Sequence, residues 1–145
     1  MRAIVQRVLQ AQVEVDGKVV GSISRGFLTY LGVSMSDKLP LAAKMADRVG
    51  GLRIFEDLNG KMNLSLQDVR GGILAIPNFT LLADASQGRR PAFSGAATSE
   101  SAQPIFDHFV LSLKQMGLSV SSGEFGADML IRSKADGPVN ILLET

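Results

Sequence analysis

The chain has 145 residues, a length that suits one domain with a single buried core. Hydrophobic residues make up 46% of it and charged residues 20%, which excludes intrinsic disorder, and the lack of cysteine excludes disulfides, thiolate zinc sites and a Cys nucleophile. With one histidine, His108, a multi-histidine metal site is impossible, and the formal charge of +1 means that any nucleic-acid surface must be local.

The apolar pattern in the first half of the chain predicts strands, tight turns and one helix. Alternation of apolar and polar residues is typical of strands, and Asp-Gly or Asn-Gly pairs are typical of hairpin turns. Apolar residues at helical spacing, followed by paired glycines, predict a helix and its end. In order, these signals predict strands on either side of a turn at Asp16-Gly17, a buried strand over 27–33, a helix over 41–52 and a turn at Asn59-Gly60.

The second half of the chain predicts further strands and a second helix. The expected elements are a short strand over 65–69, an apolar strand over 73–76, a loop or helix entry over 94–99, a helix over 105–116 stopped by Gly117, and strands over 129–133 and 139–143 separated by a turn. No repeat or linker divides the chain, so we expect one α/β domain over 1–145: a curled mixed sheet or small β-barrel with two main helices. The chain has no apolar run as long as a membrane span and no signal-peptide core, so we expect a cytoplasmic protein without a membrane partner.

The stretch ILAIPNFTLLADASQGRRPAF, residues 73–93, has features of a site for an anionic ligand. An apolar strand breaks at Pro77-Asn78, the polar Thr80 follows, and Arg89-Arg90 comes after a glycine. Two guanidinium groups on a loop can bind phosphates through paired hydrogen bonds. The plainer alternative is a solvated turn, and the sequence leaves both interpretations open.

Three other features each have a plain structural explanation. His108 lies about 100° from the centre of the apolar stripe of its helix, so we interpret it as a surface residue and not as a catalytic base. The DGPVN stretch reads as a turn, although a cis peptide at Gly137-Pro138 would present its carbonyl groups in an unusual direction. Phe125 and Met129 read as core residues, although a ring and a thioether can also sandwich a base.

Five motifs match one protein family in order and spacing: MRAIVQRV, LRIFED-NGKMNLS, FTL-AD---GRRP-FS, FGADM and DGPV. Through them the chain resembles, from end to end, the D-aminoacyl-tRNA deacylases, also called D-tyrosyl-tRNA deacylases. The resemblance implies a compact α/β-barrel fold and a homodimer. It also implies cytoplasmic hydrolysis of the ester that joins a D-amino acid, or glycine, to the 3′-terminal adenosine of tRNA. We expect no cofactor, no metal and no DNA partner.

The resemblance also assigns roles to single residues. The family's active-site strand end matches Pro77, Asn78, Phe79 and Thr80. Its Gly-cis-Pro element, which reaches into the partner subunit's site, matches Gly137-Pro138, and the arginine that braces that element matches Arg7. The pocket for the terminal adenine matches Phe125 and Met129. Arg89 and Arg90 are then expected on the phosphates of the tRNA acceptor end.

Two departures from the family pattern bear on selectivity. The family usually has Ser-Gln where this chain has Pro77-Asn78, and Thr where it has Asn140. Proline has no N–H, so an oxyanion contact from that position is lost. The related animal-type tRNA deacylases also have proline there, and they select chirality less strictly. We therefore expect hydrolysis of D-aminoacyl- and glycyl-tRNA. We also expect poorer rejection of small L-residues such as alanine than a family member with Ser-Gln shows.

The lack of a suitable histidine base fits a reaction in which the RNA assists its own hydrolysis. The vicinal ribose hydroxyl can transfer the proton, so the protein needs only to position the ester and stabilise the oxyanion with the N–H groups of Asn78, Phe79 and Thr80. No base is available to activate Thr80 as a nucleophile, so we interpret it as an orienting hydrogen-bond partner. Two alternatives remain, a protein that binds the aminoacyl-tRNA 3′ end without turnover and an enzyme that edits small L-aminoacyl-tRNAs.

Overall fold

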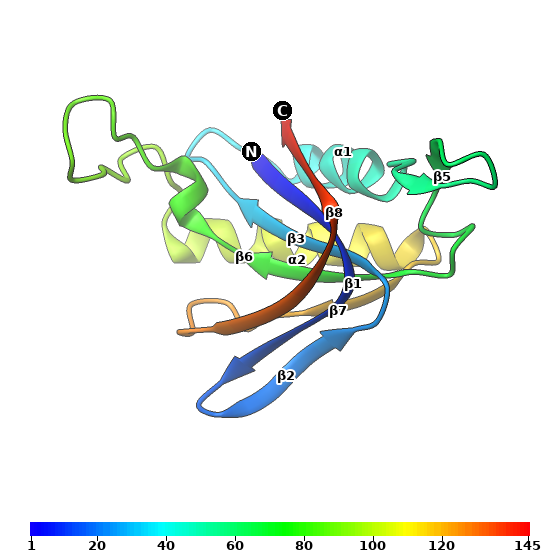
Figure 1. Cartoon of the computed structure of the whole chain (residues 1–145). Helices are drawn as coiled ribbons and strands as arrows, with labels where there is room; N and C mark the ends of the chain where they lie inside the picture. The colour runs from blue at the N-terminus through cyan, green and yellow to red at the C-terminus, as the bar shows by residue number, and fades with distance from the viewer.

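Six strands form one curled mixed sheet, and two helices pack on one of its faces (Figure 1). The computed structural model describes all residues, 1–145. In spatial order the sheet contains β2 (Lys18–Ile23), β1 (Arg2–Val15), β3 (Gly26–Gly32), β6 (Gly72–Pro77) and β7 (Ser119–Ser122), and β8 (Leu130–Glu144) also pairs with β1. The remaining elements are α1 (Leu39–Gly50), the small pair β4 (Phe55–Glu56) and β5 (Met62–Leu64), the 3₁₀ turn η1 (Phe79–Leu82) and α2 (Ser99–Gln115).

The direction of the strands determines where loops gather. β1 pairs antiparallel with β2, β3 and β8, whereas β3, β6 and β7 run parallel to one another. The carboxyl ends of β3 and β6 therefore lie at the same edge of the sheet, the edge at which open α/β sheets commonly bind ligands. At the other side of the curl, the Ser121 hydroxyl donates to the Ser22 carbonyl at 3.0 Å, which brings β7 against β2 and nearly closes the sheet into a barrel.

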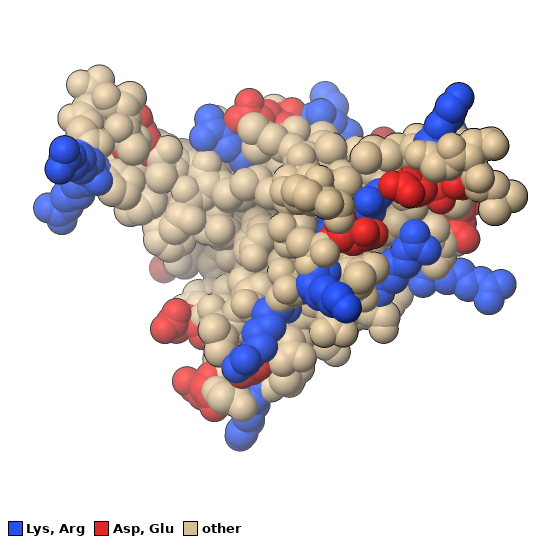
Figure 2. All heavy atoms as spheres, in the orientation of Figure 1, with Lys and Arg blue, Asp and Glu red and all other residues tan.

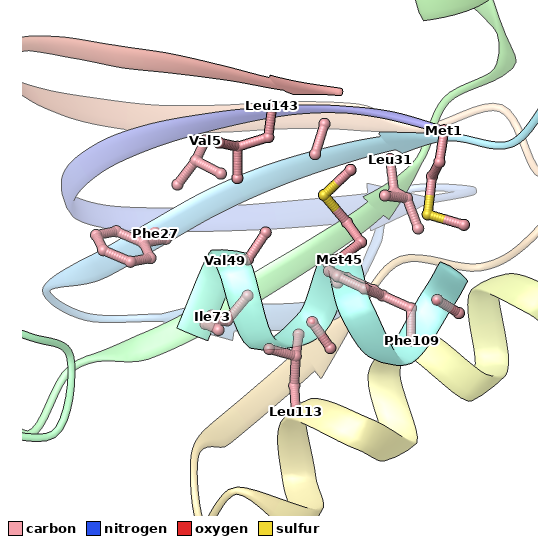
Figure 3. Close-up of a cluster of buried hydrophobic side chains, with 14 of the residues drawn as sticks. Met1, Val5, Phe27, Leu31, Met45, Val49, Ile73, Phe109, Leu113 and Leu143 are labelled. Carbon is pink, nitrogen blue, oxygen red and sulfur yellow. The ribbon is translucent and has the colours of Figure 1, made fainter. Parts of the chain in front are cut away.

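Two apolar layers stabilise this arrangement. The larger lies between the sheet and the helices, and Figure 3 shows side chains from β1, β3, β6 and both helices meeting there. Within it the Phe27 and Phe55 rings stack with centroids 5.1 Å apart. The smaller layer fills the inside of the curl, with Leu28, Leu74 and Ile76 among its members. Both faces of β3 and β6 are thus buried, which explains why these strands are apolar throughout.

The predicted α/β fold, with a curled mixed sheet and two main helices, is confirmed. The apolar stripe of α2 is buried as expected, at Ile105, Phe106, Phe109 and Leu113, and the helix starts earlier than predicted, at Ser99. Neither helix of the chain combines the length and the apolar character needed to cross a bilayer.

Three predicted elements differ in the structure. Residues 65–69 form a turn and not a strand, because the Asp68 carboxylate accepts hydrogen bonds from the Ser65 N–H and hydroxyl at 2.8 and 2.7 Å. The sequence analysis did not predict β7, because three of its four residues are serines and it shows no apolar alternation. The two strands expected around DGP are one strand, β8, since pairing with β1 continues on both sides of that segment.

The DGP segment is therefore a β-bulge within β8 and not a turn between strands. Gln6 of β1 pairs with Asn140 and Val8 pairs with Ala135, so residues 136–139 lie opposite Arg7 alone. A bulge bends its strand and redirects side chains, and bulges are frequent next to functional sites.

Candidate active site

A cavity of about 590 Å³ opens beyond the carboxyl ends of β3 and β6. Figure 2 shows the surface hollowed on this side, between a projecting loop and the lower part of the molecule. Fourteen of its 19 lining residues are hydrophobic, so the cavity favours an apolar or aromatic ligand group with a few polar contacts. Its walls come from the end of β6 and the start of η1, from the residues around the start of α2, and from residues 125–131.

The end of β6 forms one wall through a short capped turn. The Asn78 N–H donates to the Leu31 carbonyl at 2.8 Å, which ties the turn to β3. The Asn78 side-chain oxygen then accepts from the Thr80 N–H at 3.0 Å and from the Thr80 hydroxyl at 2.6 Å, the usual role of an N-cap residue. Gly32 allows this close approach, since a Cβ there would lie 2.3 Å from the Leu82 side chain and 3.0 Å from the Asn78 carbonyl oxygen.

Because of these contacts, the hydrogen-bond donors left for a ligand differ from the three N–H groups that the sequence analysis predicted. Of the three N–H groups predicted to face an oxyanion, those of Asn78 and Thr80 are already engaged within the chain. No loop or cap hydrogen bond uses the Phe79 N–H, which begins the 3₁₀ turn and so has no partner inside it. Because Thr80 fixes the oxygen of the Asn78 amide, its NH₂ group is the second donor left for a ligand.

The opposite wall holds the two residues predicted for a base. The Phe125 ring packs against the Phe106 ring of α2, with centroids 6.1 Å apart, and the Met129 side chain lies over Gly123. Both line the cavity together with Pro77, Asn78 and Phe79, so the structure brings five of the predicted site residues together. Thr80 supports this group through Asn78 but does not line the cavity itself.

Among the lining residues to which the sequence analysis gave no role are Tyr30 and Phe93. Tyr30, the only tyrosine, lies near the end of β3, and its hydroxyl makes no hydrogen bond within the chain. Burial raises its pKa, so the hydroxyl is neutral and can donate to a ligand. Phe93 lies at the mouth of the cavity, against Phe79. The motif GRRP-FS includes Phe93, but only the fold shows that it lies near Phe79.

Arg7 holds the β8 bulge from beneath. Its side chain is buried, and its Nε lies 3.1 Å from the Asp136 carboxylate and donates to the Asp136 carbonyl at 3.3 Å. Its Nη1 donates to the Ile54 carbonyl at 2.6 Å, and the Glu56 carboxylate lies 3.8 Å from Nη2. The Gly137-Pro138 peptide above it is cis, and both residues are exposed.

The bulge lies away from the cavity of its own chain. Gly137, Pro138, Arg7 and Asn140 are absent from the cavity walls, and Asn140 instead accepts from the Gln6 amide at 3.1 Å on the outer face of the sheet. Arg7 pairs with Phe27 at the start of β3, whereas the cavity begins at Tyr30, about 10 Å further along the strand. Within one chain the structure therefore separates the cavity residues from the bulge, which the resemblance assigned to the partner subunit's site.

Arg89 and Arg90 lie in an exposed loop that projects beside the cavity, where Figure 2 shows basic atoms at its tip. They are the only Lys or Arg residues between 71 and 113. Asp84 and Ala92 close the base of the loop with two backbone hydrogen bonds of 2.8 Å. The Ser86 N–H donates to the Asp84 carboxylate, which lowers the pKa of Asp84.

The comparisons with known proteins agree along the whole chain. The family model described as D-Tyr-tRNA(Tyr) deacylase matches residues 4–144. A D-aminoacyl-tRNA deacylase of Rhodopirellula baltica is 47% identical and covers 99% of both chains, and one of Geotalea daltonii is 48% identical and covers 100% of this chain and 97% of its own.

Two solved structures share the fold. One, titled c-Myc DNA Unwinding Element Binding Protein, has a TM-score of 0.93 at 36% identity and covers 100% of this chain and 99% of its own. Another, titled as a probable eukaryotic D-amino acid tRNA deacylase, has a TM-score of 0.83 at 17% identity and covers 98% and 97%.

Proposed function

Because the chain belongs to the D-Tyr-tRNA(Tyr) deacylase family, we propose that it hydrolyses the ester bond of D-aminoacyl-tRNA, a proofreading reaction on mischarged tRNA. The resemblance inferred from the motifs is confirmed by the family match. Its relatives named D-aminoacyl-tRNA deacylase support a hydrolase that acts on an ester. Glycyl-tRNA is the second expected substrate, since glycine has no side chain for a chiral filter to exclude.

The observation that carries this proposal is the composition of the cavity. It combines a strand end with free donors, at Asn78 and Phe79, and a wall with Phe125 and Met129 that suits a flat base. Its volume of about 590 Å³ lies in the range of small-ligand sites, enough for a nucleoside with an aminoacyl group. We assign the terminal adenine of tRNA to the Phe125 side and the ester to the Asn78 side.

The chemistry proposed at the Asn78 side needs donors and not a base. Water attacks the ester carbonyl carbon, and the bond from that carbon to the ribose oxygen breaks. A proton of the attacking water passes through the vicinal hydroxyl to the leaving ribose oxygen. The Phe79 N–H and the Asn78 amide stabilise the developing oxyanion, and each donor of this type contributes about 2.7–4 kcal/mol to lowering the barrier. Thr80 orients the Asn78 amide, because its N–H and hydroxyl both hold the amide oxygen.

A homodimer supplies the rest of the proposed site. Gly137 and Pro138 are exposed and do not line the cavity of their own chain, so any role at the ester requires a second copy. A symmetric dimer would insert each bulge into the other chain's cavity. There the main-chain groups of the bulge, held by Arg7, would exclude an L side chain by steric clash.

The loop with Arg89 and Arg90 is the proposed contact for the phosphates of the acceptor end. Replacing both by Ala should weaken tRNA binding and flatten its salt dependence, since fewer counterions are released. Substrate selection between amino acids should hardly change. We expect no DNA partner and a cytoplasmic location, where charged tRNA is found.

The departures at Pro77, Asn78 and Asn140 define the selectivity that we propose. Pro77 and Asn78 border the cavity, and Asn140 follows the bulge. In the proposed dimer all three would border the space into which an L side chain projects. Converting Pro77→Ser, Asn78→Gln and Asn140→Thr together should raise the ratio of D- to L-alanyl-tRNA hydrolysis. An unchanged ratio would remove these residues from chiral selection.

Deacylation of matched D-, L- and glycyl-tRNAs at catalytic enzyme concentrations tests the proposal. We expect turnover of the D- and glycyl substrates and slower turnover of L-alanyl-tRNA. Tight binding without turnover of any of them would instead support a protein that only holds the aminoacyl-tRNA 3′ end. Preferred turnover of small L-aminoacyl-tRNAs would support an editing enzyme of different specificity.

A further inference from the structure

Two phenylalanines at the mouth of the cavity are exposed to an unusual degree for aromatic residues. Phe79 is 57% exposed and Phe93 is 40% exposed. Their rings meet edge to face, with centroids 5.2 Å apart and an interplanar angle of 70°. This geometry is favourable for the pair and leaves ring surface open to solvent. Exposed apolar surface of this kind commonly marks a place where a partner binds.

The two rings lie between the cavity and the paired arginines. Phe79 begins η1 at the end of β6, and Phe93 follows directly after the loop that carries Arg89 and Arg90. The backbone pair between Asp84 and Ala92 closes that loop immediately before Phe93. A chain that leaves the cavity on this side therefore meets aromatic surface first and guanidinium groups next.

The charges on the two sides of the cavity differ, and this difference favours one exit for a polyanion. On the far side, next to Met129, a separate hollow is lined by Glu14, Asp16 and Asp128. Glu14 is paired with Arg132 at 2.9 Å, so Asp16 and Asp128 supply the negative charge that has no ion pair. Figure 2 shows acidic atoms on the lower left side of the hollowed surface and basic atoms on the projecting loop above it. Phosphates are repelled by the acidic side and attracted to the arginines.

We propose, on the basis of the deacylase function above, that the Phe79–Phe93 pair stacks with the base of the penultimate nucleotide at the single-stranded 3′ end of tRNA. The cavity holds the terminal nucleoside, the pair holds the next base, and Arg89 with Arg90 contacts the phosphates that follow. Stacking on aromatic side chains tolerates any base, because every base has a π face. The pair would thus contribute affinity common to all tRNAs.

Removal of the penultimate base and removal of the Phe93 ring should lower hydrolysis and tRNA affinity to the same extent. The substrates are D-tyrosyl-tRNA with an intact 3′ end and the same tRNA with an abasic penultimate nucleotide, and the proteins are the wild type and Phe93→Ala. Either change alone should lower kcat/KM and the affinity for uncharged tRNA by roughly 5- to 150-fold. The two changes together should lower both no further than one of them does.

Phe93→Tyr is the matched variant, since it keeps an aromatic face and should retain most of the affinity. Circular dichroism of Phe93→Ala checks that the chain still folds. Equal losses for Phe93→Ala on D-tyrosyl-tRNA and on the short ester D-tyrosyl-adenosine would overturn the proposal, because the ring would then act on the terminal nucleoside. Additive losses for the ring and the base would overturn it as well.

If the deacylase function proposed above is wrong, the experiment gives a result that differs from failure of the stacking proposal. In that case the wild type would not hydrolyse intact D-tyrosyl-tRNA at all, whereas the affinity for uncharged tRNA would still report on stacking. Affinity that is the same for intact and abasic tRNA would reject the stacking proposal whether or not hydrolysis occurs.

Discussion

The cavity end, beyond the carboxyl end of β3, and the bulge end, where Arg7 of β1 contacts β8 level with the start of β3, are built differently. The cavity end consists of loops and half-exposed turns held by local hydrogen bonds such as those between Asn78 and Thr80. The bulge end depends on one buried side chain, Arg7, which contacts two other segments of the chain. Substitutions at the cavity end should therefore have local effects, whereas loss of Arg7 alone should destabilise the bulge end.

Mixing two inactive variants tests most strongly whether the two ends meet across a dimer. Asn78→Ala damages the cavity, and Gly137→Ala damages the bulge, since Gly137 has φ +131° and a Cβ there would lie 2.6 Å from the Val139 nitrogen. Each variant alone should lose most of its activity. Coexpressed in equal amounts, half of the dimers are mixed and each mixed dimer has one intact site, so about a quarter of wild-type activity should return.

The control for that experiment pairs Gly137→Ala with the double variant Asn78→Ala, Gly137→Ala. No intact site can form in these dimers, so activity should stay low. If the first mixture also stays inactive, the bulge does not complete the partner's cavity.

Replacing Arg7 should have the largest effect on stability. Arg7→Met removes the ion pair to Asp136 and leaves the Ile54 and Asp136 carbonyls without their donor, so the free energy of unfolding should fall by about 2–4 kcal/mol. Arg132→Ala is the matched control, because its ion pair with Glu14 is exposed on the arginine side and such pairs contribute about 1 kcal/mol or less. Urea denaturation measures both; equal losses would contradict a special role for Arg7.

Asn78→Asp should separate the two functions of the Asn78 amide. The variant keeps an oxygen to cap Thr80, so stability should change by no more than about 1 kcal/mol. It loses the NH₂ donor, so kcat should fall by roughly 10²-fold with little change in KM. Thr80→Val should lower kcat much less if Thr80 orients the amide, and complete inactivity would instead indicate a nucleophilic Thr80.

The smallest expected effect is a pH response confined to the loop beside the cavity. Hydrogen bonds from Ser86 lower the pKa of Asp84 in the folded chain. The contribution of these bonds is therefore present above the ordinary Asp pKa of about 4 and is lost as the pH falls through the lowered value. The Ser86 amide resonance should shift in that acidic range. Asp84→Asn should abolish the shift.

The sequence predicted the cavity end far better than the bulge end. Motif spacing found Pro77, Asn78, Phe79, Phe125 and Met129, all of which line one cavity. The engagement of the Asn78 and Thr80 N–H groups could not be predicted, because it depends on how closely η1 approaches β3. For the same reason Tyr30 and Phe93 were missed, since their roles depend on neighbours that are distant in the chain.

The bulge end misled local sequence rules because Asp-Gly-Pro is typical of a turn. Here the pairing of β1 with β8 resumes after the segment, at Gln6 and Asn140, and outweighs the local preference. The resemblance to a family predicted the brace at Arg7, whereas the number of residues in the bulge follows only from the strand register.

The long strand β8 pairs with β1 on one side only, so its other edge presents unpaired backbone groups over much of its length. Such an edge is a template on which extended chains can add, and it invites aggregation. The bulge interrupts that template, Pro138 offers no N–H to an incoming strand, and the exposed Arg132 and Lys134 add charge beside it. The segment proposed to select substrates would thus also keep the protein from assembling into extended sheets at high concentration.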